Sequence, residues 1–183
     1  MAPPRDRKLA IMGYRSVGKS SITIQFVDNQ FVESYDPTIE NTFTRQFKLN
    51  NQEYRLHIVD TAGQDEYSLF PDSYSLDIHG YILVYSVTSA KSFEVVKVIH
   101  DKLLDMVGRI KIPIVLVGNK TDLHLERKVS TEEGQKLAQT WNAIFLETSA
   151  KHNLDVQAIF KGVIMEIERQ DGNLPEEKKC IVS

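Results

Sequence analysis

Residues 13–20 read Gly13-Tyr14-Arg15-Ser16-Val17-Gly18-Lys19-Ser20, which matches the pattern G-x-x-x-x-G-K-[ST]. An apolar run precedes this stretch at 9–12, and a helical pattern follows it over 21–27. A strand, a glycine-rich loop and a helix in this order direct backbone N–H groups and the positive end of the helix dipole at an anion. The stretch therefore predicts a loop that binds the phosphates of a nucleotide.

The residue types of this loop suit particular parts of a nucleotide. Lys19 would reach the β- and γ-phosphates, and the Ser20 hydroxyl would coordinate Mg²⁺. The predicted phosphate cradle also includes their neighbours in the chain, namely Arg15, Ser16, Val17, Gly18 and Ser21. The alternative is a glycine turn beside a solvated lysine.

Short apolar runs alternate with helical patterns along the chain. Strands are predicted at 8–12, 43–49, 54–59, 80–87, 114–117 and 144–146, and helices around 21–27, 93–107, 131–141 and 156–167. The runs 81–85 and 114–117 are continuously apolar, which is typical of strands covered on both faces. The pattern predicts a doubly wound α/β fold: a six-stranded, mostly parallel sheet with helices on both faces. A hairpin turn at 48–53 makes one edge strand antiparallel.

The length of 183 residues corresponds to one domain with a short tail. Helical periodicity stops at Asp171, so we expect a domain over 1–170 and a flexible polar tail over 171–183. A net charge of −3 gives no indication of nucleic-acid binding. The single cysteine excludes an intramolecular disulfide. No apolar signal segment or membrane-length apolar run is present, so we expect a cytoplasmic protein.

A second motif, Asp60-Thr61-Ala62-Gly63-Gln64, follows the predicted strand at 54–59. An acid at the carboxyl end of a parallel strand faces the ligand crevice, where Asp60 can hold Mg²⁺ directly or through water. Gly63 can bring its backbone N–H to the γ-phosphate without a Cβ in the way, and Gln64 can orient an attacking water. The alternative is an ordinary turn that begins at Asp60 and leaves Gln64 in solvent.

A third motif, Asn119-Lys120-Thr121-Asp122, follows the buried run 114–118. The Asp122 carboxylate can accept from the two N–H groups on one edge of guanine, a pair that adenine lacks. Asn119 would tie the base to neighbouring loops, and Lys120 could lay its methylene stem along the purine. A solvated turn is the alternative for so short a motif.

The fourth motif, Glu147-Thr148-Ser149-Ala150-Lys151, follows the predicted strand at 144–146. Its small residues allow the N–H of Ala150 to approach the guanine carbonyl, with Ser149 and Lys151 beside it. Phe31 follows the first predicted helix and could stack on the purine. Its alternative role is that of an ordinary core phenylalanine.

These four motifs, each at the end of a predicted strand, make the chain similar to the Ras superfamily of small GTPases over 8–169. The resemblance implies that the chain binds GTP and GDP and hydrolyses GTP slowly to GDP and phosphate. GTP orders two switch segments, and hydrolysis releases them. The resemblance also implies that Thr38 coordinates Mg²⁺ and senses the γ-phosphate, and that 60–78 forms the second switch. It places Val32, Tyr35 and Asp36 at the nucleotide, and Tyr35, Asp60, Gly63 and Gln64 in the catalytic group.

Three stretches, 14–16, 35–43 and 60–67, resemble one branch of this superfamily, which stimulates the target-of-rapamycin kinase complex in growth and nutrient signalling. The resemblance implies that this effector binds through 35–43, and that a tuberin-type activating protein stimulates hydrolysis by donating an asparagine. Ras has glycine at the position of Arg15, where its own activators insert an arginine. Arg15 either obstructs that approach or itself supplies transition-state charge, and we favour obstruction.

The chain ends in Cys180-Ile181-Val182-Ser183, a C-a-a-X sequence whose final serine favours farnesylation of Cys180 by a prenyltransferase. One lipid chain gives only marginal, reversible membrane binding. The tail has no second cysteine, and its lysines are offset by acids, so no polybasic patch assists. We expect loose attachment to the cytosolic face of endomembranes: lysosome, Golgi or ER. An incidental cysteine is the alternative.

The motifs leave more than one functional hypothesis. The first is a GTP-hydrolysing switch, and the second is a nucleotide-loaded binding module with vestigial hydrolysis, to which Arg15 lends weight. A third hypothesis is a P-loop kinase. Asp122 and the absence of a domain for a second substrate argue against it.

Overall fold

A computed structural model describes residues 3–31, 41–61, 63, 77–108 and 112–172. Its centre is a six-stranded sheet with the order β2-β3-β1-β4-β5-β6. The strands are β1 (Arg5–Gly13), β2 (Asn41–Leu49), β3 (Gln52–Asp60), β4 (Gly80–Ser86), β5 (Ile114–Asn119) and β6 (Ile144–Glu147). All six predicted strands are therefore confirmed, most of them with slightly longer bounds.

One strand pair is antiparallel and the others are parallel. The antiparallel pair is the hairpin of β2 and β3, and β2 lies at the edge of the sheet. Asn50 and Asn51 close the hairpin with φ of 50° and 65°, the double left-handed turn that matches the twist of the flanking strands. The predicted hairpin and antiparallel edge strand are confirmed.

Four α-helices lie in the described part of the chain: α1 (Lys19–Asp28), α2 (Ala90–Val107), α3 (Thr131–Trp141) and α4 (Val156–Gln170). Side-chain caps fix the start of two of them. Ser89 accepts from Ser92 N at the start of α2, and Ser130 and Glu133 form a reciprocal capping box at the start of α3. None of the described helices is long and apolar enough to cross a membrane.

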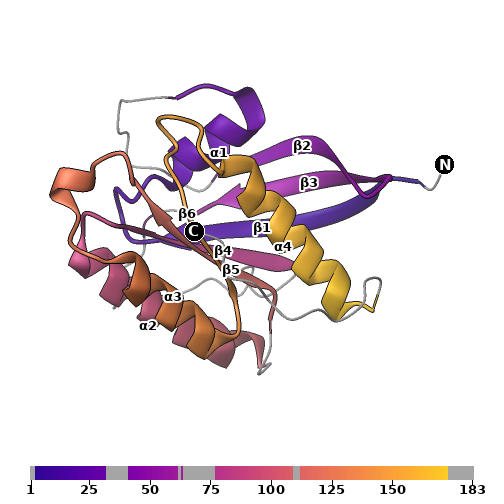
Figure 1. The fold of residues 1–183 in the computed structure, drawn as a ribbon. Helices are drawn as coiled ribbons and strands as arrows, with labels where there is room; N and C mark the ends of the chain where they lie inside the picture. Colours follow the sequence, from indigo (N-terminus) through magenta and orange to yellow (C-terminus); the bar gives the residue numbers. More distant parts are fainter. Residues whose placement is uncertain (1–2, 32–40, 62, 64–76, 109–111, 173–183) are drawn as a thin grey trace.

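Alternate residues along β1 enter two different cores. Leu9 and Ile11 pack with side chains of α1 and α4 on one face, whereas Ala10 and Met12 pack with α2 and α3 on the other. Figure 1 shows α4 lying across the sheet and α2 and α3 together on the opposite side. The predicted doubly wound fold with helices on both faces is confirmed, and both faces of β4 are buried, as its apolar sequence indicated.

A short 3₁₀ helix, η2 (His124–Glu126), follows the third motif and was not predicted. Its three residues are too few for a periodic signal. The predicted tail begins at the end of α4, but residues 173–183 lie outside the described residues, so the predicted flexibility there remains a prediction.

Candidate functional site

The four motifs lie at the carboxyl ends of four parallel strands. β1, β3, β5 and β6 end at Gly13, Asp60, Asn119 and Glu147, and each motif begins at or beside that end. Because β1 pairs in parallel with β3 and β4, and β5 with β4 and β6, these ends meet on the same side. In an open α/β sheet, ligands bind at the carboxyl ends of the strands.

The loop between β1 and α1 has a backbone that few residue types accept. Ser16 has φ of 63° and Gly18 has φ of 100°. A Cβ at Gly18 would lie 2.3 Å from Nδ2 of Asn119, and a Cβ at Gly13 would lie 2.3 Å from the carbonyl oxygen of Val84. Both glycines are thus required by close approach, and the buried Val17 fixes the loop to the core beneath it.

Lys19 is held inside the phosphate-binding loop. Only 6% of its surface is exposed, and Nζ donates to the carbonyl oxygens of Gly13 at 3.1 Å and Tyr14 at 2.9 Å. Burial lowers the pKa of Lys19 to about 8, while the nearby Asp60 carboxylate acts in the opposite direction. The geometry therefore buries the Lys19 ammonium inside the loop that is predicted to bind phosphates.

Ser20 and Asp60 meet across the same loop. The Ser20 hydroxyl donates to Oδ2 of Asp60 at 2.5 Å. Asp60 is 1% exposed, and its other oxygen, Oδ1, has no hydrogen-bond partner in the described part of the chain. Burial raises the pKa of Asp60 despite the Ser20 hydrogen bond. A buried carboxylate oxygen without a donor fits a hard divalent cation such as Mg²⁺, which prefers oxygen ligands.

The next residues of the second motif keep this loop close to the first. Thr61 is fully buried and donates through both N and Oγ1 to the carbonyl oxygen of Ile11, at 3.3 and 2.8 Å. Gly63 is exposed and lies against the backbone of Arg15. The guanidinium of Arg15, also exposed, lies 5.4 Å from the centre of the Tyr14 ring.

Asn119 joins three of the loops. Its Nδ2 donates to the carbonyl oxygen of Val17 at 2.9 Å, and its Oδ1 accepts from Thr148 Oγ1 and Ala150 N, both at 3.2 Å. The side chain is 1% exposed, so these bonds are shielded from water. The phosphate end and the base end of the predicted site are therefore held together by one amide.

Lys120 and Asp122 extend from the same segment. Lys120 has φ of 66°, and its Nζ donates to the carbonyl oxygen of Ser16 at 2.7 Å, so its stem spans from the third motif to the first. Burial lowers the pKa of Lys120. Oδ1 of Asp122 accepts from the Ser149 hydroxyl at 2.9 Å, which aligns the carboxylate that is predicted to contact the base.

Three further predicted site residues are Lys151 in the fourth motif, Ser21 in the first turn of α1, and Phe31 beyond the end of that helix. Lys151 is exposed, and Ser21 and Phe31 are partly buried, so Phe31 is not one of the fully buried core phenylalanines. Several predicted site residues lie outside the described residues: Val32, Tyr35, Asp36, Thr38, Gln64 and Cys180. Their roles stay predictions.

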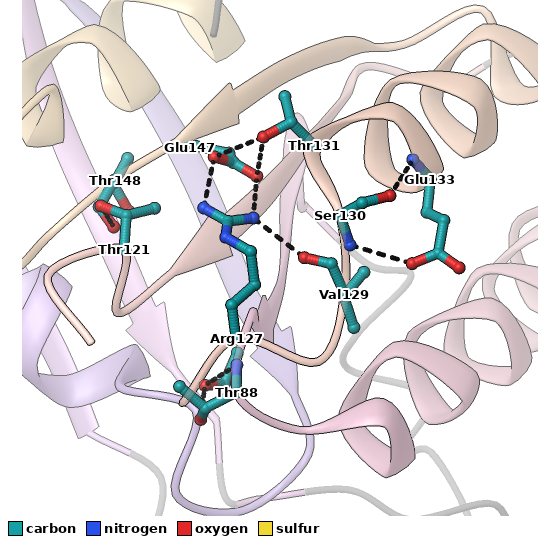
Figure 2. A network of polar contacts seen from close by, with 10 residues as sticks. Thr88, Thr121, Arg127, Val129, Ser130, Thr131, Glu133, Glu147 and Thr148 are labelled. Atoms are coloured by element: carbon teal, nitrogen blue, oxygen red, sulfur yellow. Dashed lines mark hydrogen bonds and ion pairs between the residues drawn. The ribbon is translucent and has the colours of Figure 1, made fainter. Parts of the chain in front are cut away.

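Two supports of the fourth motif were missed from the sequence. Arg127 donates to both oxygens of Glu147 at 2.9 Å and also to the carbonyl oxygen of Val129, while Thr131 Oγ1 donates to Glu147 from the other side (Figure 2). This bidentate pair braces the end of β6 just before Ser149. The second support is Gln25, on α1, whose side chain is almost fully buried. No motif contains Arg127 or Gln25, so only their spatial contacts reveal them.

A sequence model described as "Ras family" matches residues 8–169 of the chain. The chain therefore belongs to the Ras family of small GTPases, enzymes that bind guanine nucleotides and hydrolyse GTP. This confirms the superfamily and the P-loop fold predicted from the four motifs.

The chain is 65% identical over 178 residues to the GTP-binding protein Rheb of Homo sapiens, covering 97% of both chains. It is 61% identical over 181 residues to the GTP-binding protein Rheb homolog of Drosophila melanogaster, covering 99% of this chain and 100% of the relative. It is 51% identical over 185 residues to the GTP-binding protein rhb1 of Schizosaccharomyces pombe, covering 100% of both. The stretches 14–16, 35–43 and 60–67 predicted the Rheb branch, and these identities confirm that placement.

Proposed function

We propose that this small GTPase is a switch whose guanine nucleotide lies across the four loops described above, with Mg²⁺ at the phosphate end. One observation carries the proposal: the buried Asn119 amide joins Val17 of the phosphate-binding loop to Thr148 and Ala150 of the fourth motif. A ligand that has phosphates at one end and a base at the other fits such a connected pair of loops.

At the phosphate end, Lys19 supplies the principal positive charge. Its Nζ exchanges contacts with the Gly13 and Tyr14 carbonyls for contacts with phosphate oxygens, and the anionic charge restores the ammonium form that burial disfavours. Backbone N–H groups at the start of α1 add further donors.

The residues proposed for Mg²⁺ are Ser20, Asp60 and Thr38. Asp60 fits this role because its Oδ1 is buried and unpartnered within the described residues, and because its Oδ2 already contacts the Ser20 hydroxyl. Mg²⁺ held by these residues would supply positive charge that offsets the negative charge developing on the phosphates in the transition state.

At the base end, Asp122 reads the N1–H and exocyclic amine of guanine, while Ser149 holds the carboxylate in place. The Ala150 N–H is shared between Asn119 Oδ1 and the guanine carbonyl. Lys120 and Phe31 flank the purine plane. Asp122→Asn tests this assignment, because an amide pairs better with xanthine than with guanine. An unchanged guanine preference in that variant would show that the base is read elsewhere.

For hydrolysis we propose that Gly63 N–H contacts the γ-phosphate, Gln64 orients the attacking water, and Tyr35 covers the phosphates. The nucleotide contacts also extend to Val32 and Asp36. The support is the sequence resemblance together with the proximity of Gly63 to the phosphate-binding loop. Single-turnover hydrolysis with and without a tuberin-type activator separates this switch from a nucleotide-loaded module with vestigial hydrolysis. No hydrolysis in either condition would favour the module.

The proposed effector is the target-of-rapamycin kinase complex, which would bind the GTP form through residues 35–43. The proposed anchor is a farnesyl group on Cys180, added by a prenyltransferase and giving reversible attachment to endomembranes. Both proposals rest on sequence and on similarity to the Rheb proteins. Fractionation of wild type against Cys180→Ser tests the anchor, and equal membrane fractions would rule it out.

The decisive experiment on the central proposal is nucleotide analysis of the purified full-length protein. We expect bound GDP or GTP with about one Mg²⁺ per nucleotide and no ATP. Protein that carries no guanine nucleotide, and takes up none when incubated with GDP and Mg²⁺, would overturn the proposal.

A further inference from the structure

We infer that Gln25, on α1, is a positioning residue for guanine recognition: it holds the carbonyl of Ala150 so that the N–H of the same residue faces the 6-oxygen of the base. Gln25 belongs to none of the four motifs, and it lies 125 residues away from Ala150 in sequence. The inference rests on the proposed function, because it takes the base to lie against Ala150.

The contact itself is well defined. Nε2 of Gln25 donates to the carbonyl oxygen of Ala150 at 2.7 Å. Gln25 is 5% exposed and Ala150 is 3% exposed, so water does not compete for either group. The same carbonyl also accepts from Asn153 N, at 3.3 Å, so without Gln25 it keeps only this longer bond from within its own loop.

Ala150 is fixed on both of its polar backbone groups. Its N–H donates to Asn119 Oδ1 at 3.2 Å, at the long end of the range, while its C=O takes the short bond from Gln25. The tighter constraint therefore comes from α1, whose first residue is Lys19 of the phosphate-binding loop. Through Gln25, the helix that begins at the phosphates also sets the position of the residue that faces the base.

The rest of the loop follows the same anchoring pattern. Ser149 N and O pair with Leu154 O and N, at 3.3 and 2.9 Å, so the residues between form a closed turn. At its far side Asn153 Nδ2 donates to Asn29 Oδ1, an exposed bond at 2.9 Å. Asn29 caps the C-terminal end of α1, and of the two hydrogen bonds that join the loop to α1 and its cap, the one from Gln25 reaches Ala150 itself and is buried.

The test compares dissociation of GDP with that of 6-thio-GDP, whose sulfur is a weak acceptor at the atom that Ala150 would contact. The variants are Gln25→Met and Gln25→Leu, which fill the space without a donor; measuring both guards against one failing to fold. We expect GDP dissociation to rise roughly tenfold in each, and 6-thio-GDP dissociation to rise clearly less, so that the difference between the two nucleotides narrows.

Phe26→Leu is the matched control. Phe26 is the next residue on α1 and stacks on Phe160 with ring centres 3.8 Å apart, so its truncation loosens the packing of the helix but leaves the hydrogen bond from Gln25 to Ala150 in place. This variant should unfold at a lower temperature yet keep the wild-type ratio of the two dissociation rates. The inference is overturned if the Gln25 variants release GDP at the wild-type rate, or if the dissociation rates of GDP and 6-thio-GDP rise by the same factor. It is also overturned if wild type binds GDP but does not distinguish it from 6-thio-GDP. Failure of wild type to bind GDP at all would instead overturn the proposed function.

Discussion

Gly63 lies directly against Arg15. A Cβ at position 63 would come within 2.7 Å of the Arg15 Cα and 2.9 Å of its backbone nitrogen, closer than real side chains approach. The loop after β3 and the phosphate-binding loop therefore touch through bare backbone. This contact brings the backbone of Gly63 beside the phosphate-binding loop.

We predict that Gly63→Ala slows GTP hydrolysis by at least roughly tenfold, because the added methyl group must push the two loops apart and small misplacements of reacting groups are costly. Single-turnover hydrolysis at saturating Mg²⁺ measures the effect. Gly162→Ala is the control: its new Cβ would sit 3.7 Å from Ile144 and Val115, in ordinary contact, and hydrolysis should be unchanged. Equal rates in the two variants would show that the close approach is not needed.

Local sequence patterns predicted the elements that depend on local chemistry. The hairpin at 48–53 forms because two asparagines accept positive φ, and the strands and helices follow apolar periodicity. The phosphate-binding loop could also be predicted from the sequence, because close contacts leave no room for a Cβ at Gly13 and Gly18, and this requirement fixes the spacing of the glycines in the motif. Such features require only neighbouring residues to be known.

Contacts between segments that are distant in sequence could not be predicted from local patterns. Nothing in the sequence around Gln25 or Arg127 distinguishes a buried hydrogen-bonding residue from a solvated one, and each acquires its role from a partner on another element. Asn119 is an intermediate case: its motif predicted a link between loops, but only the structure identifies Val17 and Thr148 as its partners.

The Arg127–Glu147 pair gives a prediction about stability. Glu147 is 11% exposed at its side chain, so removing Arg127 leaves a nearly buried carboxylate that, among the described residues, keeps Thr131 as its side-chain donor. We expect Arg127→Met to lower the free energy of unfolding by about 2 kcal/mol. Urea unfolding in excess GDP and Mg²⁺ measures this. Lys97→Met removes the exposed pair with Glu94 and should cost less than about 0.5 kcal/mol; a similar loss in both variants would contradict the prediction.

Acid sensitivity should arise partly at His79. Its Nδ1 accepts from the backbone N–H of Lys8 at 2.8 Å, which a protonated ring cannot do. Burial, and then the charge of Arg7, lower the pKa of His79 below the ordinary 6.5. The unfolded chain thus binds this proton more readily. The stability that His79 contributes is complete above about pH 6.5 and is lost as the pH falls from there through the lowered pKa.

His79→Asn tests this because the side-chain Oδ1 of the introduced asparagine can accept from the Lys8 N–H but does not titrate. We expect the free energy of unfolding of the variant to fall less than that of wild type between about pH 7.5 and pH 5.5, both measured by urea unfolding in excess GDP. Parallel curves over this interval would show that His79 does not contribute.

The last prediction concerns Arg15 and the intrinsic rate of hydrolysis. Its guanidinium is exposed and lies over the Tyr14 ring, 5.4 Å from the ring centre, in a cation–π arrangement. We expect a charge in this position to obstruct the approach of a Ras-type activator and to repel its incoming arginine. Supplying transition-state charge in cis would require the side chain to leave Tyr14 and fold back over the γ-phosphate, where it would raise the rate of hydrolysis by up to ~10³-fold or more.

We therefore expect Arg15→Gly to keep the intrinsic rate within a few-fold of wild type and to gain a response to a Ras-type activator. Single-turnover hydrolysis with and without that activator measures both effects. An intrinsic rate that falls at least tenfold in Arg15→Gly would establish Arg15 as catalytic and the obstruction hypothesis as wrong.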